Sequence, residues 1–382
     1  MQLLGVAETP FMTAYARILG DSVGKDHRDN YDWRRFGPEP TPSRSPRGNF
    51  AATMLKPLRR GVFRSSEEKR RLDAGLRFAE PHAADLEWLY ERLDEDQSRK
   101  ALVQLIAFRA LGYRHVKLPL NQSDHWRSLE AMEKRAEGRE TIDPGFLGWR
   151  LPKLDLRELG YPIELFSWPT SAVSQFVNQQ YRCETADGLI DAKEGDIAVD
   201  AGGCWADTAL YFADRVGSQG RVYSFEFLPD NLEVYQRNLK LNPELASRIE
   251  LLPHPVWSAA GEELFISQNG PGTTVGPTPR SESDKTVRTV TIDQLLERPA
   301  VNRVDFIKMD IKGAELPALR GAEAVLRRFR PQLAITVYHS LSDFWEIPQY
   351  LDSLGLGYRF YLRHFTIHAE ETVLFATCDG GN

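Results

Sequence analysis

Two adjacent glycines follow an apolar run in the stretch DAGGCWADTALYFA, residues 200–213. Gly202 and Gly203 can adopt backbone angles that are closed to other residues, and they let a ligand approach the main chain. In an open α/β sheet, the turn after the first strand lies near the point where strand order reverses, and ligands bind there. The stretch therefore predicts a binding turn, although a glycine pair also fits a tight turn without a ligand.

A carboxylate, Glu226, stands near the end of the next apolar run, RVYSFEF. At that place it can accept hydrogen bonds from both hydroxyls of a ribose. A nicotinamide enzyme would also need the spacing GxGxxG, which lets the backbone approach a pyrophosphate, and the residues after Ala201 lack it. S-adenosylmethionine, an adenosine compound without phosphate, therefore fits better. The alternative is that Glu226 is an exposed charge at a strand end.

Three more polar residues follow two later apolar runs. Asp310 stands near the end of VDFIKMDI, and Tyr338 and His339 follow LAITV. Histidine has a reference pKa of about 6.5 and accepts a proton near neutral pH, so His339 is a candidate general base. A hydrogen-bonded structural histidine is the alternative. Lys308 has the same strand parity as Asp310, so an ion pair between them is one structural explanation of this cluster.

The elements that would position these residues are short β-branched runs that alternate with amphipathic helices, which is typical of a parallel sheet with crossover helices. The connection between the last two runs is too short for a helix, so the final strand should run antiparallel to the one before it. The predicted fold class is a doubly wound, mostly parallel α/β sheet with one antiparallel C-terminal strand. We expect strands at 197–202, 221–227, 249–257, 304–311, 333–338, 358–364 and 371–377, and helices that begin near Asp207, Asp230, Glu315 and Asp343.

The first 165 residues have a different pattern. Four prolines in FGPEPTPSRSPRGNF restrict their neighbours and remove backbone donors, and we assign residues 1–65 to a poorly structured arm or linker. Apolar residues then recur at helical spacing, which predicts a mainly helical N-terminal domain over 66–165, followed by the α/β domain over 166–382. The helical domain would cover the acceptor side of the site, or would serve dimerisation or stability.

The composition limits the class of protein. A chain of 382 residues with 42% hydrophobic residues and a net charge of −6 is an ordinary globular protein and does not favour nucleic acid. Its three cysteines are far apart, with no CxxC pair and no histidine at zinc-finger spacing, so we expect neither a disulfide framework nor a structural zinc site, and a reducing cytoplasm fits best. Neither a signal peptide nor a membrane span is expected.

Five blocks of the sequence together resemble the FkbM family of S-adenosylmethionine-dependent methyltransferases. They are DAGGCWADTALYFA, VYSFEFLPDNLEVYQRNLKLN, DFIKMDIKGAELPALRGAE, AITVYHSLSDFWEIP and YLRHFTIHAEETVLFA, within about 180–378. The resemblance implies a Rossmann-like domain that transfers a methyl group, usually to a hydroxyl of a natural product or a glycan sugar. It places the methionine end of the cofactor around Asp200, Gly202, Gly203, Cys204 and Thr208, the ribose on Glu226, and the adenine near Val256 and Trp257.

Two residues depart from the family pattern. Ala206 stands where glycine is usual, and Lys312 stands where glutamate is usual. Alanine with left-handed angles would cost about 1 to 2 kcal/mol, whereas in the first turn of a helix its methyl group would only crowd the cofactor. Lys312 reverses the local charge, which disfavours a cationic cofactor or magnesium unless the side chain points away.

Our main prediction is O-methylation by direct displacement, with S-adenosylmethionine as the donor and a small-molecule or saccharide hydroxyl as the acceptor. His339 would act as base, Asp310 would orient the acceptor or the cofactor, and Tyr338 would line the pocket. The two departures keep open a second hypothesis, a catalytically silent member of the family that serves as a binding or assembly partner. A nicotinamide oxidoreductase is a third. A homodimer is also compatible with the sequence.

Overall fold

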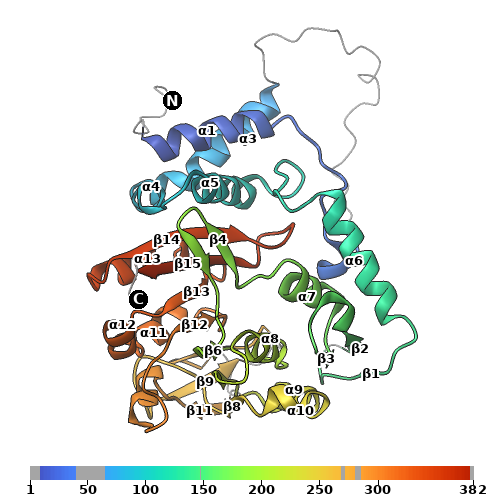
Figure 1. Cartoon of the computed structure of the whole chain (residues 1–382). Coiled ribbons are helices and arrows are strands. Elements are labelled where there is room, and N and C mark those ends of the chain that lie inside the picture. Colours follow the sequence, from blue (N-terminus) through green and yellow to red (C-terminus); the bar gives the residue numbers. More distant parts are fainter. Residues whose placement is uncertain (1–8, 40–64, 147, 268–271, 280–284, 379–382) are drawn as a thin grey trace.

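The computed structural model describes residues 9–39, 65–146, 148–267, 272–279 and 285–378. A seven-stranded sheet forms its centre (Figure 1). In spatial order its strands are β14 (Tyr358–His364), β15 (Thr372–Cys378), β13 (Gln332–Thr336), β12 (Phe306–Met309), β6 (Ile197–Ala201), β7 (Arg221–Phe225) and β8 (Ile249–Leu252). β15 is antiparallel to both of its neighbours, and all other pairs are parallel. The predicted fold class is confirmed.

The helices that cross over the sheet begin close to where the sequence placed them. Because β6 and β12 are buried along their whole length, they appear in the sequence as nearly continuous apolar runs. Strand order reverses between β6 and β12, so their carboxyl ends form the switch point at which ligands bind in such sheets. The helices are α8 (Asp207–Arg215), α9 (Pro229–Leu241), α10 (Pro243–Ala246), α11 (Glu315–Arg320), α12 (Glu323–Phe329) and α13 (Asp343–Ser353).

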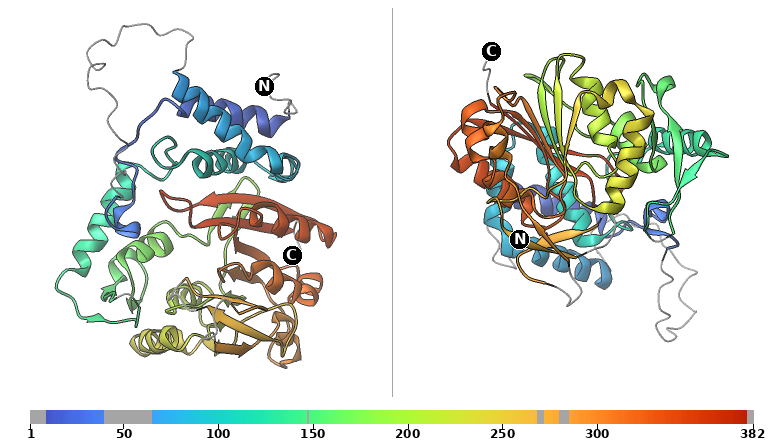
Figure 2. Two further views of the ribbon diagram at one scale, coloured as in Figure 1. Left: turned by 180° about the vertical axis from the view of Figure 1, so that it is seen from behind. Right: turned by 90° about the horizontal axis from the view of Figure 1, so that it is seen from below.

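Most of the N-terminal helices (α1, α3, α4 and α5) pack beyond β14 and β15, whereas α6 packs beside α7 (Pro169–Ala172) and β2 (Leu151–Asp155), as both side views show (Figures 1 and 2). Leu105 and Ile106 belong to the same apolar core as Phe360 and Leu362 of β14, so these helices have no core of their own. Helix α5 contacts β14 directly, and α4 packs on α13. The helices are α1 (Pro10–Ser22), α2 (Trp33–Phe36), α3 (Ser66–Ala79), α4 (Ala83–Arg92), α5 (Asp96–Leu111) and α6 (Ser123–Ala136).

Helix α1 corrects the prediction that residues 1–65 form a poorly structured arm. Phe11, Tyr15 and Leu19 are fully buried on its inner face, which packs against α5. The proline at the start of α1 fits because the first turn of a helix needs no backbone donor there. Residues 40–64, which include most of the predicted linker, lie outside the described residues.

Three small antiparallel sheets were not predicted. They are β1 (Thr141–Ile142) with β2 (Leu151–Asp155) and β3 (Glu164–Phe166), β4 (Cys183–Thr185) with β5 (Gly188–Ile190), and β9 (Glu263–Ser267) with β10 (Thr274–Gly276) and β11 (Lys285–Arg288). The sheet of β1, β2 and β3 shows that the region 66–165 is not entirely helical. The sheet of β9, β10 and β11 lies in the chain between β8 and β12, and the expected strand 249–257 is shorter than predicted, because β8 ends at Leu252. Among the described helices, none has the length and apolar character to cross a membrane.

Candidate functional site

The glycine pair after β6 is required by close packing within the chain. A Cβ atom on Gly202, whose φ is 89°, would lie 2.1 Å from the main-chain oxygen of Asp310. A Cβ on Gly203 would lie 2.4 Å from Oγ of Ser224 on β7. No larger residue fits either position, so the turn is pressed against the ends of the two neighbouring strands.

Ala206 occupies the position just before α8 with left-handed angles, φ 68° and ψ 10°. Its side chain is fully buried and does not line the cavity described below. The methyl group therefore strains the backbone and does not crowd a ligand. The departure from glycine at this position is a matter of stability.

We expect Ala206→Gly to raise the free energy of unfolding by about 1 kcal/mol, because glycine adopts left-handed angles without the steric cost that alanine meets. Urea denaturation measures the change. Ala209→Gly, in the right-handed interior of α8, is the matched control and should lower the free energy by about 1 kcal/mol. Equal destabilisation by both substitutions would contradict the left-handed assignment.

Asp200 fixes the turn from inside the protein. Its buried carboxylate accepts hydrogen bonds from Oγ1 of Thr208 at 3.0 Å, Oγ of Ser224 at 2.9 Å and Nζ of Lys308 at 2.9 Å. The Lys308 ammonium also donates to the main-chain oxygen of Gly202 at 2.7 Å. Burial acts to lower the pKa of Lys308, but Asp200 and neighbouring carboxylates outweigh it and raise that pKa.

This arrangement corrects two expectations. Lys308 pairs with Asp200, which lies beside it in the register of β6 and β12, and its pairing with Asp310 is not observed. Asp200 itself is absent from the cavity wall. It supports the binding turn, and the surface toward a ligand comes from Gly202, Cys204 and Thr208.

A cavity of about 250 Å³ opens at the carboxyl ends of β6, β7 and β12. Six of the predicted site residues line it: Gly202, Cys204, Thr208, Glu226, Val256 and Asp310. Five do not: Asp200, Gly203, Trp257, Tyr338 and His339. Tyr338 nevertheless contacts Asp310 from behind the wall, as described below.

Glu226 is held in the cavity wall by its own neighbours. Oε1 accepts hydrogen bonds from the backbone N–H groups of Phe227 at 2.6 Å and Leu228 at 2.8 Å, and Oε2 accepts one from Nδ2 of Asn231 at 3.1 Å. Burial raises the pKa of Glu226 against the opposing effect of these donors. The side chain is 7% exposed, so the alternative of an exposed charge at a strand end is wrong.

Asp310, which follows β12, lines the cavity together with the residues of the binding turn. Its carboxylate accepts hydrogen bonds from the hydroxyls of Tyr181 and Tyr338, each at 3.3 Å. Burial acts to raise the pKa of Asp310, but the positive charges of Lys312 and His339 outweigh it and lower that pKa. Asp310 is therefore an ionised acceptor of hydrogen bonds at neutral pH.

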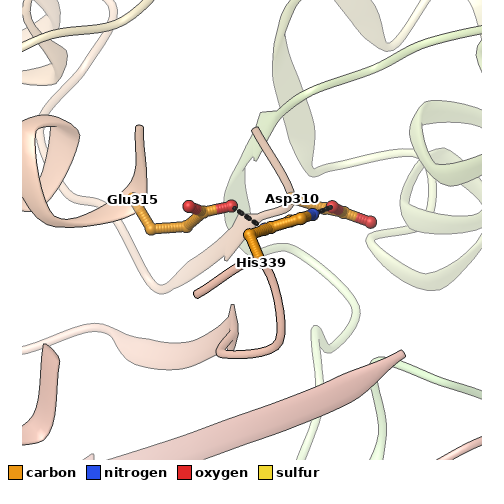
Figure 3. A group of neighbouring side chains, drawn as sticks. All are labelled: Asp310, Glu315 and His339. Atoms are coloured by element: carbon orange, nitrogen blue, oxygen red, sulfur yellow. Dashed lines mark ion pairs between the residues drawn. The ribbon is translucent and has the colours of Figure 1, made fainter. Parts of the chain in front are cut away.

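His339 lies between two carboxylates (Figure 3). Nε2 is 3.4 Å from Oδ1 of Asp310, and Nδ1 is 3.0 Å from Oε1 of Glu315. Glu315 also accepts the backbone N–H groups of Ile311 and Gly313, at 2.9 and 2.8 Å, and so fixes the loop after β12. One ligand atom from each of these three residues lies within 4.8 Å of the other two, a spacing at which the group could hold a metal ion.

His339 does not line the cavity, so its predicted role as general base has no direct support from the position of the side chain and stays a prediction. Burial acts to lower its pKa, but Glu315 and Asp310 outweigh that effect and raise it. Its contacts with both carboxylates place His339 between the loop after β12 and Asp310.

Lys312 points into the cavity, which excludes the expectation that it might point away. Its φ is 54°, and Nζ donates to the hydroxyl oxygen of Tyr338 at 3.3 Å. Burial acts to lower its pKa, but Asp310 and Glu371 outweigh burial and raise it. The ammonium thus remains charged among carboxylates, which answers the concern that it would be unbalanced there.

Sequence reasoning missed two residues that line the same cavity, Tyr181 and Glu371, and it named Asp207 only as a carboxylate beside the turn. Burial raises the pKa of Asp207 to about 6, although Lys308 opposes the shift. Sequence reasoning looked for residues at the carboxyl ends of parallel strands, where ligands bind. Tyr181 lies before the first strand of the sheet and Glu371 lies before the last, so neither was found in this way. The only sequence signal for Glu371 was its place in the fifth family block.

The far end of the cavity is built largely from the N-terminal half of the chain. Arg35 of α2 pairs with Glu370 at 2.8 Å, and the neighbouring Arg34 pairs with Glu133 of α6 at 2.6 Å. The first pair holds α2 against the loop between β14 and β15, and the second holds α2 against α6. The wall at this end contains Asp32, Arg35, His125, Thr170, Ser174, His368 and Glu370.

Comparisons with known proteins agree with this architecture. Residues 189–360 match the family model described as the methyltransferase FkbM domain. A crystal structure of the methyltransferase FkbM from Methylobacillus flagellatus KT aligns with a TM-score of 0.50 at 19% identity, over 80% of this chain and 61% of that chain. The present chain thus spans about three fifths of that protein's length.

Two further solved structures align less well. The S-adenosylmethionine-dependent O-methyltransferase from Thermotoga maritima has a TM-score of 0.35 at 14% identity, over 57% of this chain and 68% of that one. Fibrillarin from Aeropyrum pernix, solved with bound S-adenosylmethionine, has a TM-score of 0.32 at 15% identity, over 49% and 68%. No curated protein sequence matches the chain significantly. The family match therefore identifies residues 189–360 of this chain as an FkbM methyltransferase domain.

Proposed function

We propose that the protein binds S-adenosylmethionine in the cavity beside Glu226 and transfers its methyl group to a hydroxyl oxygen of a small molecule or a saccharide. The observation that carries the proposal is one continuous cavity that joins the turn at Gly202 and Cys204 to Glu226 on one side and to Asp310 on the other. The family match supports methyl transfer, and the choice of oxygen as acceptor is our inference.

The cofactor would lie with its ribose on Glu226 and its amino-acid end at the turn. Oε2 of Glu226 accepts one hydrogen bond, from Asn231, and a carboxylate oxygen can accept two, so this oxygen has room for a ribose hydroxyl. The walls near Glu226 carry Val256 and Phe227, which would pack on the adenine. The sulfonium would then face Asp310, whose negative charge stabilises a cation.

The reaction itself would be a direct displacement. The acceptor oxygen attacks the methyl carbon, the bond between that carbon and sulfur breaks, and the sulfur keeps the electron pair. The protein contributes mainly by holding the two reactants in line, an effect that supplies several kcal/mol. The far end of the cavity would hold the acceptor, which explains why α2 and α6 contribute to its wall.

Titration calorimetry with S-adenosylhomocysteine, the stable product, tests the proposal. Glu226→Gln should weaken binding about tenfold to hundredfold, because it removes a charged acceptor of hydrogen bonds from the ribose. Glu233→Gln, at an exposed position of α9, is the matched control and should leave the dissociation constant unchanged. Absence of binding heat for the unsubstituted protein with either S-adenosylmethionine or S-adenosylhomocysteine would refute the proposal.

A catalytically silent protein is less well supported. That hypothesis arose from Ala206 and Lys312, but Ala206 lies away from the cavity and the charge of Lys312 is balanced by Asp310 and Glu371. Neither residue blocks the site. A titration with NAD tests the oxidoreductase hypothesis, and we expect no binding because the turn lacks a cradle for a pyrophosphate.

A further inference from the structure

The hydroxyl of Tyr338 has more partners than it has protons. Its oxygen lies 3.3 Å from Oδ1 of Asp310, 3.2 Å from Oε1 of Glu371 and 3.3 Å from Nζ of Lys312. Lys312 donates to this oxygen, and the phenol has a single O–H to donate. At any moment, therefore, only one of the two carboxylates receives the hydrogen bond from Tyr338.

The two carboxylates differ in their other partners. Asp310 also accepts the hydroxyl of Tyr181 and lies beside the charged ring of His339. Within the described ranges, Glu371 receives one other side-chain hydrogen bond, from Nε2 of Gln180 to Oε2. When Tyr338 donates to Asp310, Oε1 of Glu371 is left as the acceptor that needs a donor.

Glu371 is placed where a ligand could supply that donor. Its side chain lines the cavity beside Lys312 and Asp310. Its backbone has a φ of 65°, a strained conformation for a residue other than glycine, and such strain persists mainly at functional sites. The neighbouring Glu370 is tied to Arg35, so the loop that carries Glu371 is anchored. Burial, and then the charge of Asp310, raises the pKa of Glu371, which makes it a better proton acceptor.

We propose that Glu371 is the residue that removes the proton from the methyl acceptor, with Lys312 beside it to stabilise the negative charge that develops on the acceptor oxygen. The proposal rests on the methyl transfer proposed above. As the acceptor oxygen forms its bond to the methyl carbon, its proton moves to Oε1 of Glu371 and the electron pair of the broken carbon–sulfur bond stays on sulfur. The products are the methyl ether and S-adenosylhomocysteine, and Glu371 later returns the proton to solvent.

Lys312 places a positive charge close to Glu371 in the cavity wall. Its ammonium contacts the same phenol as Glu371, so both groups face one small region of the cavity. A fixed cation at that place favours an oxyanion without any rearrangement during the reaction. The loop conformation that directs Lys312 there is held by Glu315, which His339 contacts in turn.

Two nucleosides that differ in one charge test this placement. Sinefungin carries an ammonium group where S-adenosylmethionine carries its transferable methyl, and S-adenosylhomocysteine carries no charge there. The measurement is the dissociation constant of each compound by calorimetry, for the intact chain and for its variants. The ratio of the two constants reports the charges that face the methyl position, and affinity for S-adenosylhomocysteine reports an intact fold and cofactor seat.

We expect Glu371→Gln to weaken sinefungin about tenfold, because the ammonium loses a facing carboxylate, and to leave S-adenosylhomocysteine unchanged. Lys312→Gln should act in the opposite direction and tighten sinefungin about threefold or more, because it removes a like charge. Glu233→Gln on α9 is the control and should leave both constants as they are.

The outcomes separate this proposal from the one on which it rests. If the intact chain binds neither compound, the proposed methyl transfer fails and this inference fails with it. If both compounds bind and neither variant changes their ratio, the methyl transfer stands and the assignment of Glu371 and Lys312 is overturned. If Glu371→Gln abolishes binding of S-adenosylhomocysteine as well, the result for Lys312→Gln is decisive. Tighter binding of sinefungin by that variant supports the placement, and an unchanged ratio of the two dissociation constants overturns it.

Discussion

Replacing Lys308 with methionine should lower the free energy of unfolding by about 3 to 5 kcal/mol. Methionine has a similar length and fits the space, but it leaves Asp200 as a buried carboxylate with no cation beside it. The hydroxyls of Thr208 and Ser224 still donate to Asp200, yet neutral donors do not balance its charge. Urea denaturation followed by circular dichroism at pH 7 measures the loss.

A double variant separates the ion pair from the space that Lys308 fills. Asp200→Asn combined with Lys308→Met should recover a large part of the loss, because neither buried charge then remains alone. Lys240→Met, at an exposed position on α9, is the control and should change the free energy by less than about 0.5 kcal/mol. A loss below about 1 kcal/mol for Lys308→Met would contradict the buried pair.

The sequence predicted the central sheet well because its strands and helices are marked locally. β6 and β12 are buried along their whole length and are apolar apart from Asp200 and Lys308. Helices α8, α11 and α13 begin at the residues expected, Asp207, Glu315 and Asp343. The antiparallel direction of β15 followed from a connection too short for a helix. These features depend on residues that are close together in the chain, so the sequence pattern alone is enough to predict them.

The partners of individual side chains were harder to predict from the sequence. Lys308 has the same parity as Asp310 on one strand, but its partner is Asp200 on the neighbouring strand, and only the register of β6 and β12 reveals that. Helix α1 was missed because a single short apolar pattern before a proline-rich stretch gives little signal. Its inner face became clear only when α5 was in place beside it.

The acceptor side of the site was hardest to predict. Tyr181 precedes the first strand of the sheet in the chain and Glu371 precedes the last, and the fold brings Tyr181 to Asp310 and Glu371 to Tyr338. His339 was placed correctly near Asp310, but its role depends on Glu315, which reaches it from the start of α11. Against the effect of burial, the second carboxylate adds to the first in raising the pKa of His339, and no pattern in the sequence indicates that contact.

The array of Asp310, His339 and Glu315 should make stability depend on pH. His339→Gln is expected to lower the free energy of unfolding by about 3 kcal/mol near pH 6, because it removes a buried cation from between two carboxylates. The pKa of His339 is raised in the folded protein above its unfolded value of about 6.5. The stabilisation that its proton provides is therefore complete below about pH 6.5 and is lost as the pH rises through the folded pKa.

The difference between the intact protein and His339→Gln should thus shrink as the pH rises from 6 to 9, since at high pH both proteins lack the cation. Urea denaturation at several pH values measures the two free energies. His254→Gln removes an exposed histidine and should show a small difference that stays constant over this range. A difference for His339→Gln that grows with pH would mean that the neutral imidazole is the form stabilised by the fold, and His339 would then regain its place as a candidate base.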